Sequence, residues 1–366
     1  ALLVGALKSI SSPARLCLGG LLRNNLMKKI NILVTASSGD IGQGVIKSLR
    51  MFGRKMRIIA TDINAESCGL FLADKGYIIE PVLGDEKKFL KDIITICNKE
   101  KIDIVFSCFE AEQIVIAKNV ERLKASTKAY FVVQPEKVLD ICNQDKLATY
   151  RFLSKNNIRV PETYTTKNGA DKLIKKYGWP LVLKPRHGSG SKDFYIIKNK
   201  KELDKKWPNV SNPIIQEYID NGKDEEYTVG VFLTKDSRAL GAITMLRKLK
   251  FGMTWHAIAN HQKDMADVAK KTAESVGAIG PCNVQLRRDK NHQPCVIEIN
   301  ARISSTTIFR AMLGFNEALA AIDYFLENKR PALDYKDGFI MRLFGEHIVP
   351  QLRYAKLKKQ GRITNI

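Results

Sequence analysis

The sequence lacks the features of a disulfide-rich, zinc-binding or membrane-spanning protein. Its seven cysteines include no C-x-x-C pair, so they indicate neither a zinc site nor a disulfide framework. No apolar run is long enough to cross a bilayer. These absences favour a globular protein in a reducing compartment, and we expect it to be cytoplasmic and to work without a membrane.

Acidic residues are also scarce. The sequence has 38 Asp and Glu but 60 Lys and Arg, which gives a formal net charge of +22. Such an excess suggests nucleic-acid binding, because Lys and Arg neutralise phosphates. However, residues 1–26 and 351–366, which contain no acid, account for eight of these charges, and many lysines in the rest of the chain lie beside acids. No RNA-reading aromatic motif accompanies the charge. Attraction of anionic ligands is the simpler interpretation, and we do not expect a nucleic-acid partner.

The chain is long enough for two or three domains, with 366 residues of which 45% are hydrophobic. Residues 1–26 are basic, contain serine and have no acid, a composition typical of a transit peptide. Residues 27–30, which begin with Met27, nevertheless read like a start just before the first strand. We therefore expect residues 1–26 to be an extension that is not part of the fold.

Strands and helices alternate over residues 27–143. Alternation of this kind predicts right-handed βαβ units around a parallel sheet, and hence a Rossmann-like first domain in an α/β protein. The expected strands are at residues 29–35, 57–61, 102–107 and 129–133, and the expected helices are at residues 40–51, 87–99 and 111–123.

A glycine-rich turn follows the first of these strands, with glycines at Gly39, Gly42 and Gly44. A turn in this place is typical of a dinucleotide-binding site, in which Asp62 at the end of the second strand would bind the ribose. The order of the glycines differs from G-x-G-x-x-G, so we interpret the turn as structural or as facing another substrate. An NAD(P)-dependent oxidoreductase remains the alternative.

Two polar strand segments at residues 283–287 and 296–300 are separated by a turn-rich stretch. If that stretch closes a hairpin, Gln285 falls opposite Glu298, and side chains alternate between an oxygen-rich and an apolar face. An oxygen-rich face with Arg302 at its exit suits Mg²⁺ beside phosphate. The predicted polar face comprises Asn283, Gln285, Glu298 and Asn300, and the apolar face comprises Val284, Leu286, Ile297 and Ile299.

A second group of motifs suits a nucleotide. An apolar strand at residues 179–183 leads into Lys184 and then into a loop of glycine and serine at residues 188–191, whose N–H groups and hydroxyls can wrap phosphate oxygens. Strand-like runs at residues 214–219 and 225–229 follow, with carboxylates between them. Backbone groups there would read the adenine edge, and a carboxylate would accept hydrogen bonds from the ribose.

The order of these motifs resembles the ATP-grasp superfamily, most closely a single ATP-grasp half of the carbamoyl-phosphate synthase large chain. The resemblance covers about residues 27–330, and motifs in the right order are far more specific than any one alone. The sequence departs from the pattern at Ala301, where many relatives have proline, and at Asp193, where many have a further loop glycine. The matching residues are Asp145 and Lys146; Lys184, Pro185 and Arg186 with the loop; Gln216, Glu217 and Tyr218 with Glu226 and Tyr227; and Asn283, Val284 and Gln285 with Glu298, Ile299, Asn300 and Arg302.

The resemblance implies a Rossmann-like pre-ATP-grasp domain at residues 27–143 and an ATP-grasp domain at residues 144–330. The latter would consist of a small lid, about residues 162–216, and a larger α+β nucleotide-binding half. Residues 331–366 are then expected to form a strand and a basic tail that ends as coil. The sequence has no internal repeat, so we expect one ATP-grasp unit and not the duplicated synthase.

The resemblance also implies roles for individual residues. Glu217, Tyr218 and Ile219 would hold adenine, and Glu226, with Glu225 as its rival, would hold the ribose. The residues expected to bind ATP are Lys146, Lys184, Arg186, Gly188, Ser189, Gly190, Ser191, Glu217, Tyr218, Ile219 and Glu226. Gln285, Glu298 and Asn300 are the expected ligands of two Mg²⁺ ions, or of Mn²⁺ in their place. Arg302 would stabilise the transferred phosphoryl group, and Arg247 and Lys250 would touch phosphate or the substrate carboxylate.

The implied activity is that of an ATP-dependent carboxylate-amine ligase, which forms ADP and an acyl phosphate and then an amide. Its partners would be a small carboxylate and a small amine. A non-catalytic ATP-binding sensor is an alternative beside the oxidoreductase. A homodimer is compatible with the sequence.

Overall fold

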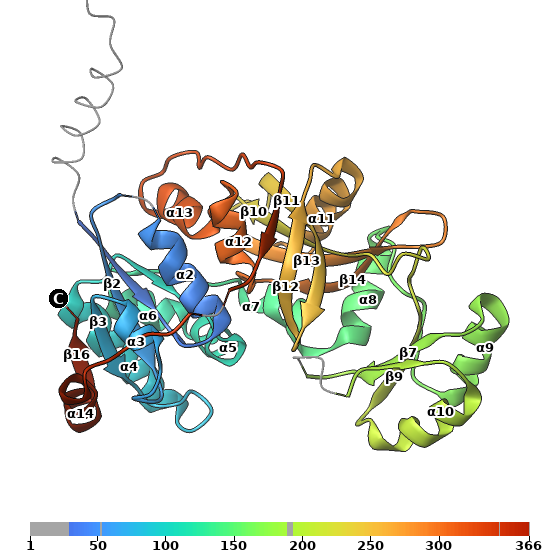
Figure 1. Ribbon diagram of the computed structural model, residues 1–366, viewed down its shortest axis with the longest axis horizontal. Coiled ribbons are helices and arrows are strands. Elements are labelled where there is room, and N and C mark those ends of the chain that lie inside the picture. The colour runs from blue at the N-terminus through green and yellow to red at the C-terminus, as the bar shows by residue number, and fades with distance from the viewer. Residues whose placement is uncertain (1–28, 52, 189–192, 344, 366) are drawn as a thin grey trace, which may run out of the picture.

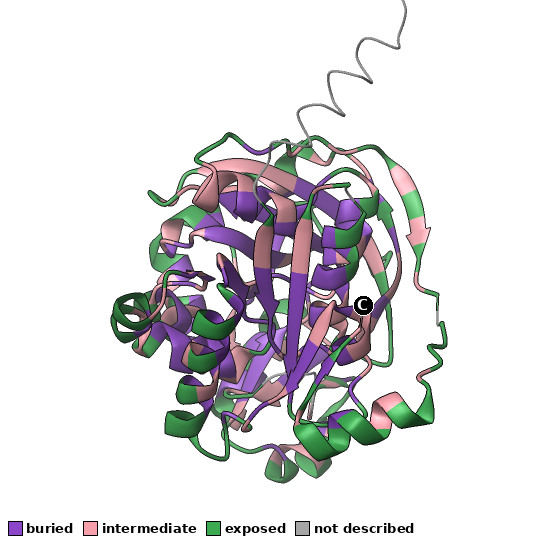
Figure 2. Cartoon of the chain, turned by 90° about the vertical axis from the view of Figure 1, so that its left-hand side faces the viewer, coloured by how far each residue is buried: buried purple, intermediate pink, exposed green. Residues whose placement is uncertain are grey.

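Three β-sheets organise the part of the chain that the computed structural model describes, which is residues 29–51, 53–188, 193–343 and 345–365. In Figure 1 the first sheet lies on the left, the second in the middle and the third on the right. Figure 2 shows that the strands carry most of the buried residues, whereas the outer surfaces of the helices are exposed. The α/β class is as expected from the sequence, and so is a first domain built on a mostly parallel sheet that precedes the two antiparallel sheets.

The first sheet has the strand order β16-β3-β2-β1-β4-β5, and β1 to β5 are parallel. Ile32, Leu33 and Val34 are fully buried, as expected for a strand covered on both faces. β3 and α3 are short and were not expected from the sequence. The elements are β1 (Ile30–Val34), α2 (Asp40–Arg50), β2 (Met56–Asp62), α3 (Gly69–Leu72), β3 (Lys75–Ile78), α4 (Glu86–Glu100), β4 (Ile104–Phe106), α5 (Glu110–Lys118), α6 (Val120–Ser126) and β5 (Tyr130–Val132).

The last described segment returns to this first sheet, and it corrects the expected coil. Helix α14 (Gln351–Gln360) is followed by strand β16 (Arg362–Thr364), which pairs antiparallel with β3. Leu357 and Ile363 are buried in the core of the first domain, which is why a segment rich in lysine and arginine is nevertheless folded. Residues 331–366 therefore contribute to two sheets.

The second sheet has the order β14-β13-β10-β11-β12-β15, with every neighbouring pair antiparallel. Helix α11 (Lys263–Ser275) packs on one face, where Met265 and Ala269 share a hydrophobic cluster with Val229 and Leu286. The strands are β10 (Glu226–Leu233), β11 (Ala239–Lys250), β12 (Met253–Ala259), β13 (Gly280–Arg288), β14 (Pro294–Asn300) and β15 (Gly338–Met341).

The predicted hairpin is present as β13 and β14, and its register is confirmed. Gln285 lies opposite Glu298, and Asn283 lies opposite Asn300. The register shifts just after Gln285, so that Leu286 pairs with Val296. The apolar face is therefore corrected at one position, because Val296 packs in the core in place of Ile297, which is only half-buried.

The third sheet is small, with the order β6-β9-β7-β8, and it spans the region expected as the lid. Its own hydrophobic cluster includes Leu173, Leu183 and Leu203. Its elements are β6 (Thr163–Tyr164), α9 (Lys167–Tyr177), β7 (Leu181–Pro185), β8 (Tyr195–Ile197), α10 (Lys200–Lys206), η2 (Trp207–Asn209) and β9 (Pro213–Glu217).

The remaining helices connect the sheets. The π-helix η1 (Asp140–Gln144) and α8 (Lys146–Lys155) lead from the first sheet toward the lid, and α12 (Thr307–Met312), α13 (Glu317–Ala321) and η3 (Ile322–Leu326) follow the hairpin. α7 (Glu136–Leu139) precedes η1. Within the described residues, no helix has both the length and the apolar character that a membrane span requires.

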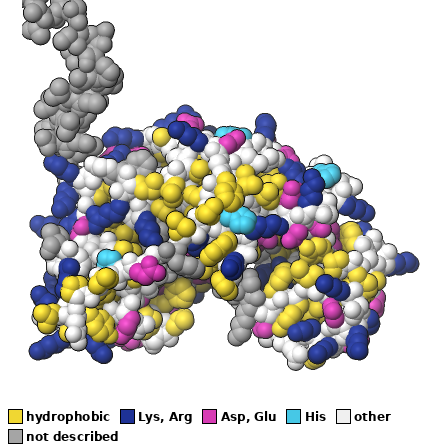
Figure 3. Space-filling view, viewed as in Figure 1, with side chains coloured by type: hydrophobic (Ala, Val, Ile, Leu, Met, Phe, Trp, Pro, Cys, Tyr) yellow, Lys and Arg dark blue, Asp and Glu magenta, His cyan; other side chains and the backbone are white. Residues whose placement is uncertain are grey.

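On the face that Figure 3 shows, the positive charge is not gathered into one area. Figure 3 shows lysine and arginine side chains on all parts of the visible face, interspersed with acidic side chains and with an apolar area over the middle of the molecule. This face therefore offers no continuous basic stripe for a nucleic-acid backbone.

A buried ion pair joins the second sheet to the helices behind it. The side chains of Arg310 in α12 and Glu317 in α13 are both completely buried, with Nη1 of Arg310 2.7 Å from Oε1 of Glu317. Nη2 of Arg310 also donates to Oγ1 of Thr228 at 3.3 Å and to Oδ1 of Asn283 at 2.5 Å. Arg310 crosses β10 at Gly230, where an added Cβ would lie 2.4 Å from Nη1.

We predict that Gly230→Ala lowers the free energy of unfolding by about 1–3 kcal/mol, because the new methyl group overlaps the arginine and neither group has room to move. The measurement is urea-induced unfolding followed by circular dichroism. Gly53→Ala is the matched control, since a Cβ at Gly53 meets nothing within 4 Å. Equal stability of the two variants would contradict the tight packing at Gly230.

Candidate functional site

A pocket lies where the hairpin, the start of α8 and the first residue of the glycine-serine loop come together. It encloses about 420 Å³ of empty space, part of which is open to solvent. The π-helix η1 contributes Cys142 and Asn143, and irregular helices of this kind are often found at functional sites. The lining residues are Glu110, Cys142, Asn143, Lys146, Thr149, Tyr150, Gly188, Glu298, Ile299 and Asn300.

Lys146 begins helix α8 and reaches back to the loop. The Asp145 carboxylate caps the helix by accepting from the N–H of Leu147 at 3.0 Å. The Lys146 ammonium group donates to the carbonyl oxygen of Gly188. Burial lowers the pKa of Lys146, and the nearby positive charge of Lys184 lowers it further. The structure thus places the ammonium group of Lys184 near that of Lys146, which lines the pocket.

Tyr150 joins the second ammonium group to the hairpin, and the sequence analysis missed this role. Nζ of Lys184 donates to the Tyr150 hydroxyl at 2.8 Å, and that hydroxyl donates to the carbonyl oxygen of Ile297 at 2.6 Å. Tyr150 was not among the site residues expected from the sequence. The signal that could have found it is its position one helical turn after Lys146, which places both side chains on one face.

Arg186 does not point into the pocket. Its guanidinium group forms a two-pronged pair with Asp145, with Nε 2.6 Å from Oδ1. This hydrogen bonding lowers the pKa of Asp145 to about 2. The pair ties the end of β7 to the start of α8, and so it positions Lys146 and Gly188. Ser189, Gly190 and Ser191 lie outside the described residues.

A row of polar side chains runs along the end of β14 and continues to Arg302 just after it. Glu298 is exposed, and Nδ2 of Asn300 donates to its Oε1 at 3.3 Å. Nη2 of Arg302 donates to Oδ1 of Asn300 at 3.1 Å. Glu110, at the start of α5, lies near this row. Burial raises the pKa of Glu110, the positive charge of Arg302 lowers it, and the negative charge of Glu298 raises it further. Sequence reasoning missed Glu110, because it is the first residue of a helix in a different domain.

A second row of side chains connects β10, β11 and β13. Nε of Arg247 donates to Oε1 of Glu226 at 3.0 Å, and Nη2 donates to Oε1 of Gln285 at 2.9 Å. Arg247 thus belongs to the network around the hairpin. Lys250 does not, since it lies at the exposed end of the β11–β12 hairpin with its Nζ 4.8 Å from the centre of the Trp255 ring.

In the segment expected to hold adenine, protein groups already bind the carboxylate of Glu217. The Glu217 carboxylate is buried, where it accepts from Arg159 and, at 2.8 Å, from the N–H of Glu162. The ring of Tyr218 faces the guanidinium group of Arg287 at 5.1 Å, and Ile219 is buried. Any contact of Glu217 with adenine must therefore be made by its main chain.

The oxygen atoms of Gln285, Glu298 and Asn300 fit a magnesium site. Each amide oxygen has two lone pairs, and one arginine bond leaves a lone pair for a cation. Mg²⁺ prefers such oxygens and usually shares its coordination with substrate phosphates. Within the described residues, no three histidine, cysteine or acidic side chains form a cluster that could hold a metal ion.

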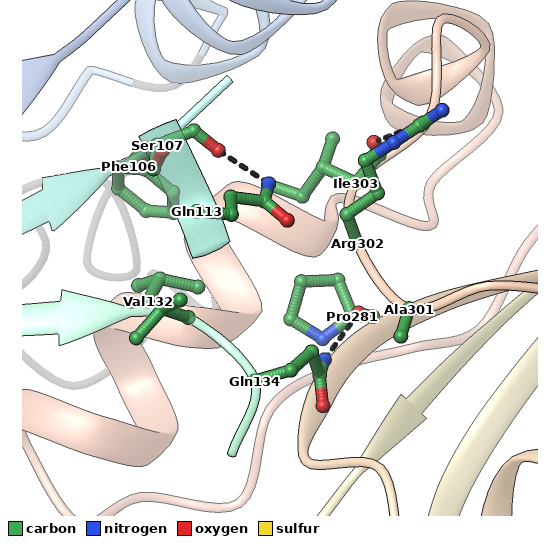
Figure 4. A pocket seen from close by; sticks show the side chains of 10 residues that line it. Phe106, Ser107, Gln113, Val132, Gln134, Pro281, Ala301, Arg302 and Ile303 are labelled. Atoms are coloured by element: carbon green, nitrogen blue, oxygen red, sulfur yellow. Dashed lines mark hydrogen bonds between the residues drawn. The ribbon is translucent and has the colours of Figure 1, made fainter. Parts of the chain in front are cut away.

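A second, narrow pocket lies between the first sheet and the exit of the hairpin, with about 260 Å³ of empty space, part of which is open to solvent (Figure 4). Arg302 and Ile303 form one side, and Ser107 and Gln113 form the other. Nε2 of Gln113 donates to the carbonyl oxygen of Ser107 at 2.8 Å. Gln134 bridges the domains by donating to the carbonyl oxygen of Ile279 at 2.6 Å.

The glycine turn of the first domain is explained by packing. The N–H and Oγ of Ser38 donate to Oδ2 of Asp62 at 2.8 and 2.7 Å, so that this aspartate stabilises the turn. A Cβ at Gly42 would lie 2.5 Å from the carbonyl oxygen of Ala36. A Cβ at Gly44 would lie 2.7 Å from Thr307 in the other domain. These close approaches account for the glycines without a dinucleotide.

Comparison with known proteins agrees with this geometry. Residues 143–306 match the model of the ATP-grasp domain, and residues 32–129 match that of the PylC-like N-terminal domain. The chain is 26% identical over 281 residues to the formate-dependent phosphoribosylglycinamide formyltransferase of Prochlorococcus marinus, covering 72% of this chain and 67% of that protein.

Solved structures share the fold at lower identity. The biotin carboxylase domain dimer of Hydrogenobacter thermophilus 2-oxoglutarate carboxylase, in complex with MgADP, ADP and bicarbonate, is 17% identical with a TM-score of 0.64, covering 86% of this chain and 74% of that one. The L-amino acid ligase of Bacillus licheniformis is 20% identical with a TM-score of 0.60, covering 81% and 74%. The expected family and its use of ATP are confirmed. The chain belongs to the ATP-grasp superfamily of ATP-dependent ligases, with a PylC-like N-terminal domain in front of its ATP-grasp domain.

Proposed function

We propose that this ligase activates a small carboxylate as an acyl phosphate and transfers the acyl group to an amine. The observation that carries the proposal is the first pocket, which is lined by Lys146, Glu298 and Asn300. Lys184 lies beside it, where it donates to Tyr150 of the lining and its charge acts on Lys146. Like charges held close together are costly unless an anion lies between them. ATP phosphates and their cation match this distribution of charge.

Different protein groups would bind the phosphates, the adenine and the ribose of ATP. Lys146 and Lys184 bind the phosphates together with the loop of Gly188, Ser189, Gly190 and Ser191. Arg186 ties the end of β7 to Asp145 at the start of α8. The main chain of Glu217, Tyr218 and Ile219 binds adenine. Glu226 accepts from the ribose, with Arg247 fixing the orientation of its carboxylate.

Gln285, Glu298 and Asn300 would hold two Mg²⁺ ions, or Mn²⁺ in their place. Bound there, the cations neutralise the negative charge that develops on the phosphates during transfer. Arg247 and Arg302 already orient the two amide oxygens of this set. The arginines thus determine which way the ligands point.

In the first step a carboxylate oxygen attacks the γ-phosphorus, and the bond to the ADP oxygen breaks, giving acyl phosphate and ADP. Arg302 neutralises charge on the transferred group, because phosphoryl transfer depends mostly on positioning and electrostatics. In the second step the amine nitrogen attacks the acyl carbon and the C–O bond to phosphate breaks. Phosphate leaves with the electron pair of that bond, and the nitrogen loses a proton to give the amide. Lys250 would contribute a positive charge at the rim.

The named relatives support this chemistry in part. Formate, on which the formyltransferase of Prochlorococcus marinus depends, is a carboxylate, and the Bacillus licheniformis enzyme is described as an L-amino acid ligase. Small-molecule partners, a cytoplasmic location and a homodimer complete the proposal. The described cysteines are all free thiols, which agrees with a reducing compartment.

Glu298→Ala is predicted to abolish substrate-dependent ADP release, with a loss of at least roughly 100-fold, since even the outer partners of a metal site contribute about 10- to 100-fold. The assay contains Mg²⁺, ATP, pooled amino acids and small carboxylates, with hydroxylamine to trap acyl phosphate as hydroxamate. Glu121→Ala, at an exposed helix position, is the control. ATP binding without ADP or hydroxamate in the wild type would indicate a sensor in place of a ligase.

Lys184→Met is predicted to weaken MgATP binding by roughly 10- to 100-fold, because a charge-assisted hydrogen bond is lost. Tyr150→Phe should weaken it less, by roughly 3- to 10-fold, since the lysine remains and loses only its hydroxyl partner. Isothermal titration calorimetry measures both, with exposed Lys205→Met as control. The proposed roles fail if Tyr150→Phe is the more damaging change, or if Lys184→Met binds normally.

A further inference from the structure

Strand β15 forms an edge of the second sheet that the described chain leaves open. It ends the strand order β14-β13-β10-β11-β12-β15, and among the described residues no strand pairs with its outer side. The opposite edge is closed, because the N–H of Val296 in β14 donates to the carbonyl oxygen of Arg159 at 2.9 Å. An open edge presents unpaired main-chain groups to another strand.

The main-chain groups of Phe339 and Met341 point outward from this edge. The N–H of Arg342 donates to the carbonyl oxygen of Trp255 at 2.8 Å, so Arg342 bonds toward β12. The hydrogen bonds of an antiparallel pair alternate along each strand, and Ile340 therefore bonds toward β12 as well. The two residues on either side of Ile340 are left with their N–H and carbonyl groups on the outer side.

The side chains along this edge are apolar and exposed. Phe339, Met341 and Leu343 are 58%, 54% and 83% exposed, and alternate residues of an extended chain share one face. Ile258 on β12, which is 43% exposed, lies opposite Phe339. Figure 3 shows an apolar area over the middle of the molecule, where β12 and β15 lie in Figure 1. A contiguous exposed apolar area of this kind marks a protein contact.

The edge lacks the features that keep edge strands apart. Charged side chains, proline and bulges prevent edge-to-edge pairing in natural sheets. β15 contains no charged residue and no proline, and its register against β12 is regular. The next residue, Arg342, is turned toward its own chain, where Nε donates to the carbonyl oxygen of Thr254 at 3.2 Å and Nη2 to that of Ser305 at 3.1 Å. The edge is therefore open to a strand that is equally uncharged.

We propose that the occupant is a second copy of this chain, whose β15 pairs antiparallel with β15 across a twofold axis. An antiparallel pair is itself twofold symmetric, so one edge can serve both copies. The outward groups then set Phe339 opposite Met341 of the partner subunit, with Ile340 on the axis. Each of the two resulting pairs aligns apolar side chains. The inference deepens the homodimer of the proposed function, on which it rests, and joins the sheets that carry Gln285 and Glu298 in the two copies.

The register centred on Ile340 is the one that keeps charge out of the pair. A shift of two residues in one direction would bring the exposed Asp337 opposite Met341 of the partner subunit, and a carboxylate held against an apolar side chain is costly. A shift in the other direction would bring Arg342 opposite Ile340 of the partner subunit. β15 is thus complementary to itself in a single register.

The first test is sedimentation velocity of the full chain at roughly 1–100 µM, in low and in high salt. We expect dimers that are tighter in high salt, because each copy has a formal net charge of +22 and salt screens the repulsion between copies. A complex bridged by a polyanion would behave in the opposite way. A mass of one chain under every condition, or dimers that dissociate in high salt, would overturn the inference.

Variants locate the contact and its register. Phe339→Lys and Met341→Glu should each weaken the dimer by roughly tenfold or more, because each sets a charge against an apolar side chain of the other copy. A mixture of the two variants should regain the dimer, since the register brings the new positive charge of one chain opposite the new negative charge of the other. Leu83→Lys, at an apolar position of the first domain that is 80% exposed, is the matched control. Circular dichroism checks that the variants are folded.

The outcomes separate this inference from the proposed ligase. Dimers that both single variants leave unchanged, or a mixture of folded variants that stays monomeric, would overturn the inference. Substrate-dependent ADP and hydroxamate would still uphold the ligase in either case. Dimers that follow the expected pattern, in a protein that never releases ADP, would uphold the interface and reject the ligase.

Discussion

The buried pair of Arg310 and Glu317 is the interaction on which the site depends most. A charged side chain without contact with water must be matched by its neighbours, and Arg310 is matched by Glu317, Thr228 and Asn283. Asn283 lies opposite Asn300 across the hairpin. The ion pair thereby fixes the hairpin from behind, while the proposed magnesium ligands stand on the same two strands. Loss of either partner would leave an uncompensated charge beneath the site.

The site is also held rigid from the front. Lys184 is tied through Tyr150 to the backbone of β14, and Lys146 is tied to the backbone of the loop at Gly188. Both ammonium groups are therefore positioned by protein groups. Such preorganisation reduces the rotational freedom that a ligand must remove when it binds.

Sequence reasoning succeeded where local chemistry determines structure. Side-chain alternation was sufficient to place Gln285 opposite Glu298, because a polar residue moved by one position would enter the core. The bulge after Gln285 could not be predicted, since it depends on how β14 meets the tyrosine of α8. Glu110 was missed for a related reason: it approaches Lys146 and Glu298 only after two domains have packed together. The carboxylate of Glu217 shows the opposite limit, because a motif locates a residue without saying whether its side chain or its main chain faces the ligand.

Strand β16 gives the first domain an unusual dependence on synthesis order. Its residues 362–364 complete a sheet whose other strands lie before residue 133, and Leu357 and Ile363 fill part of that domain's core. A ribosome must therefore finish the whole intervening ATP-grasp region before the first sheet can close. Until then the edge of β3 is unpaired, and an unpaired edge strand is a site of aggregation. The first domain to emerge is thus the last to be completed, and a chaperone would have its longest period of contact there.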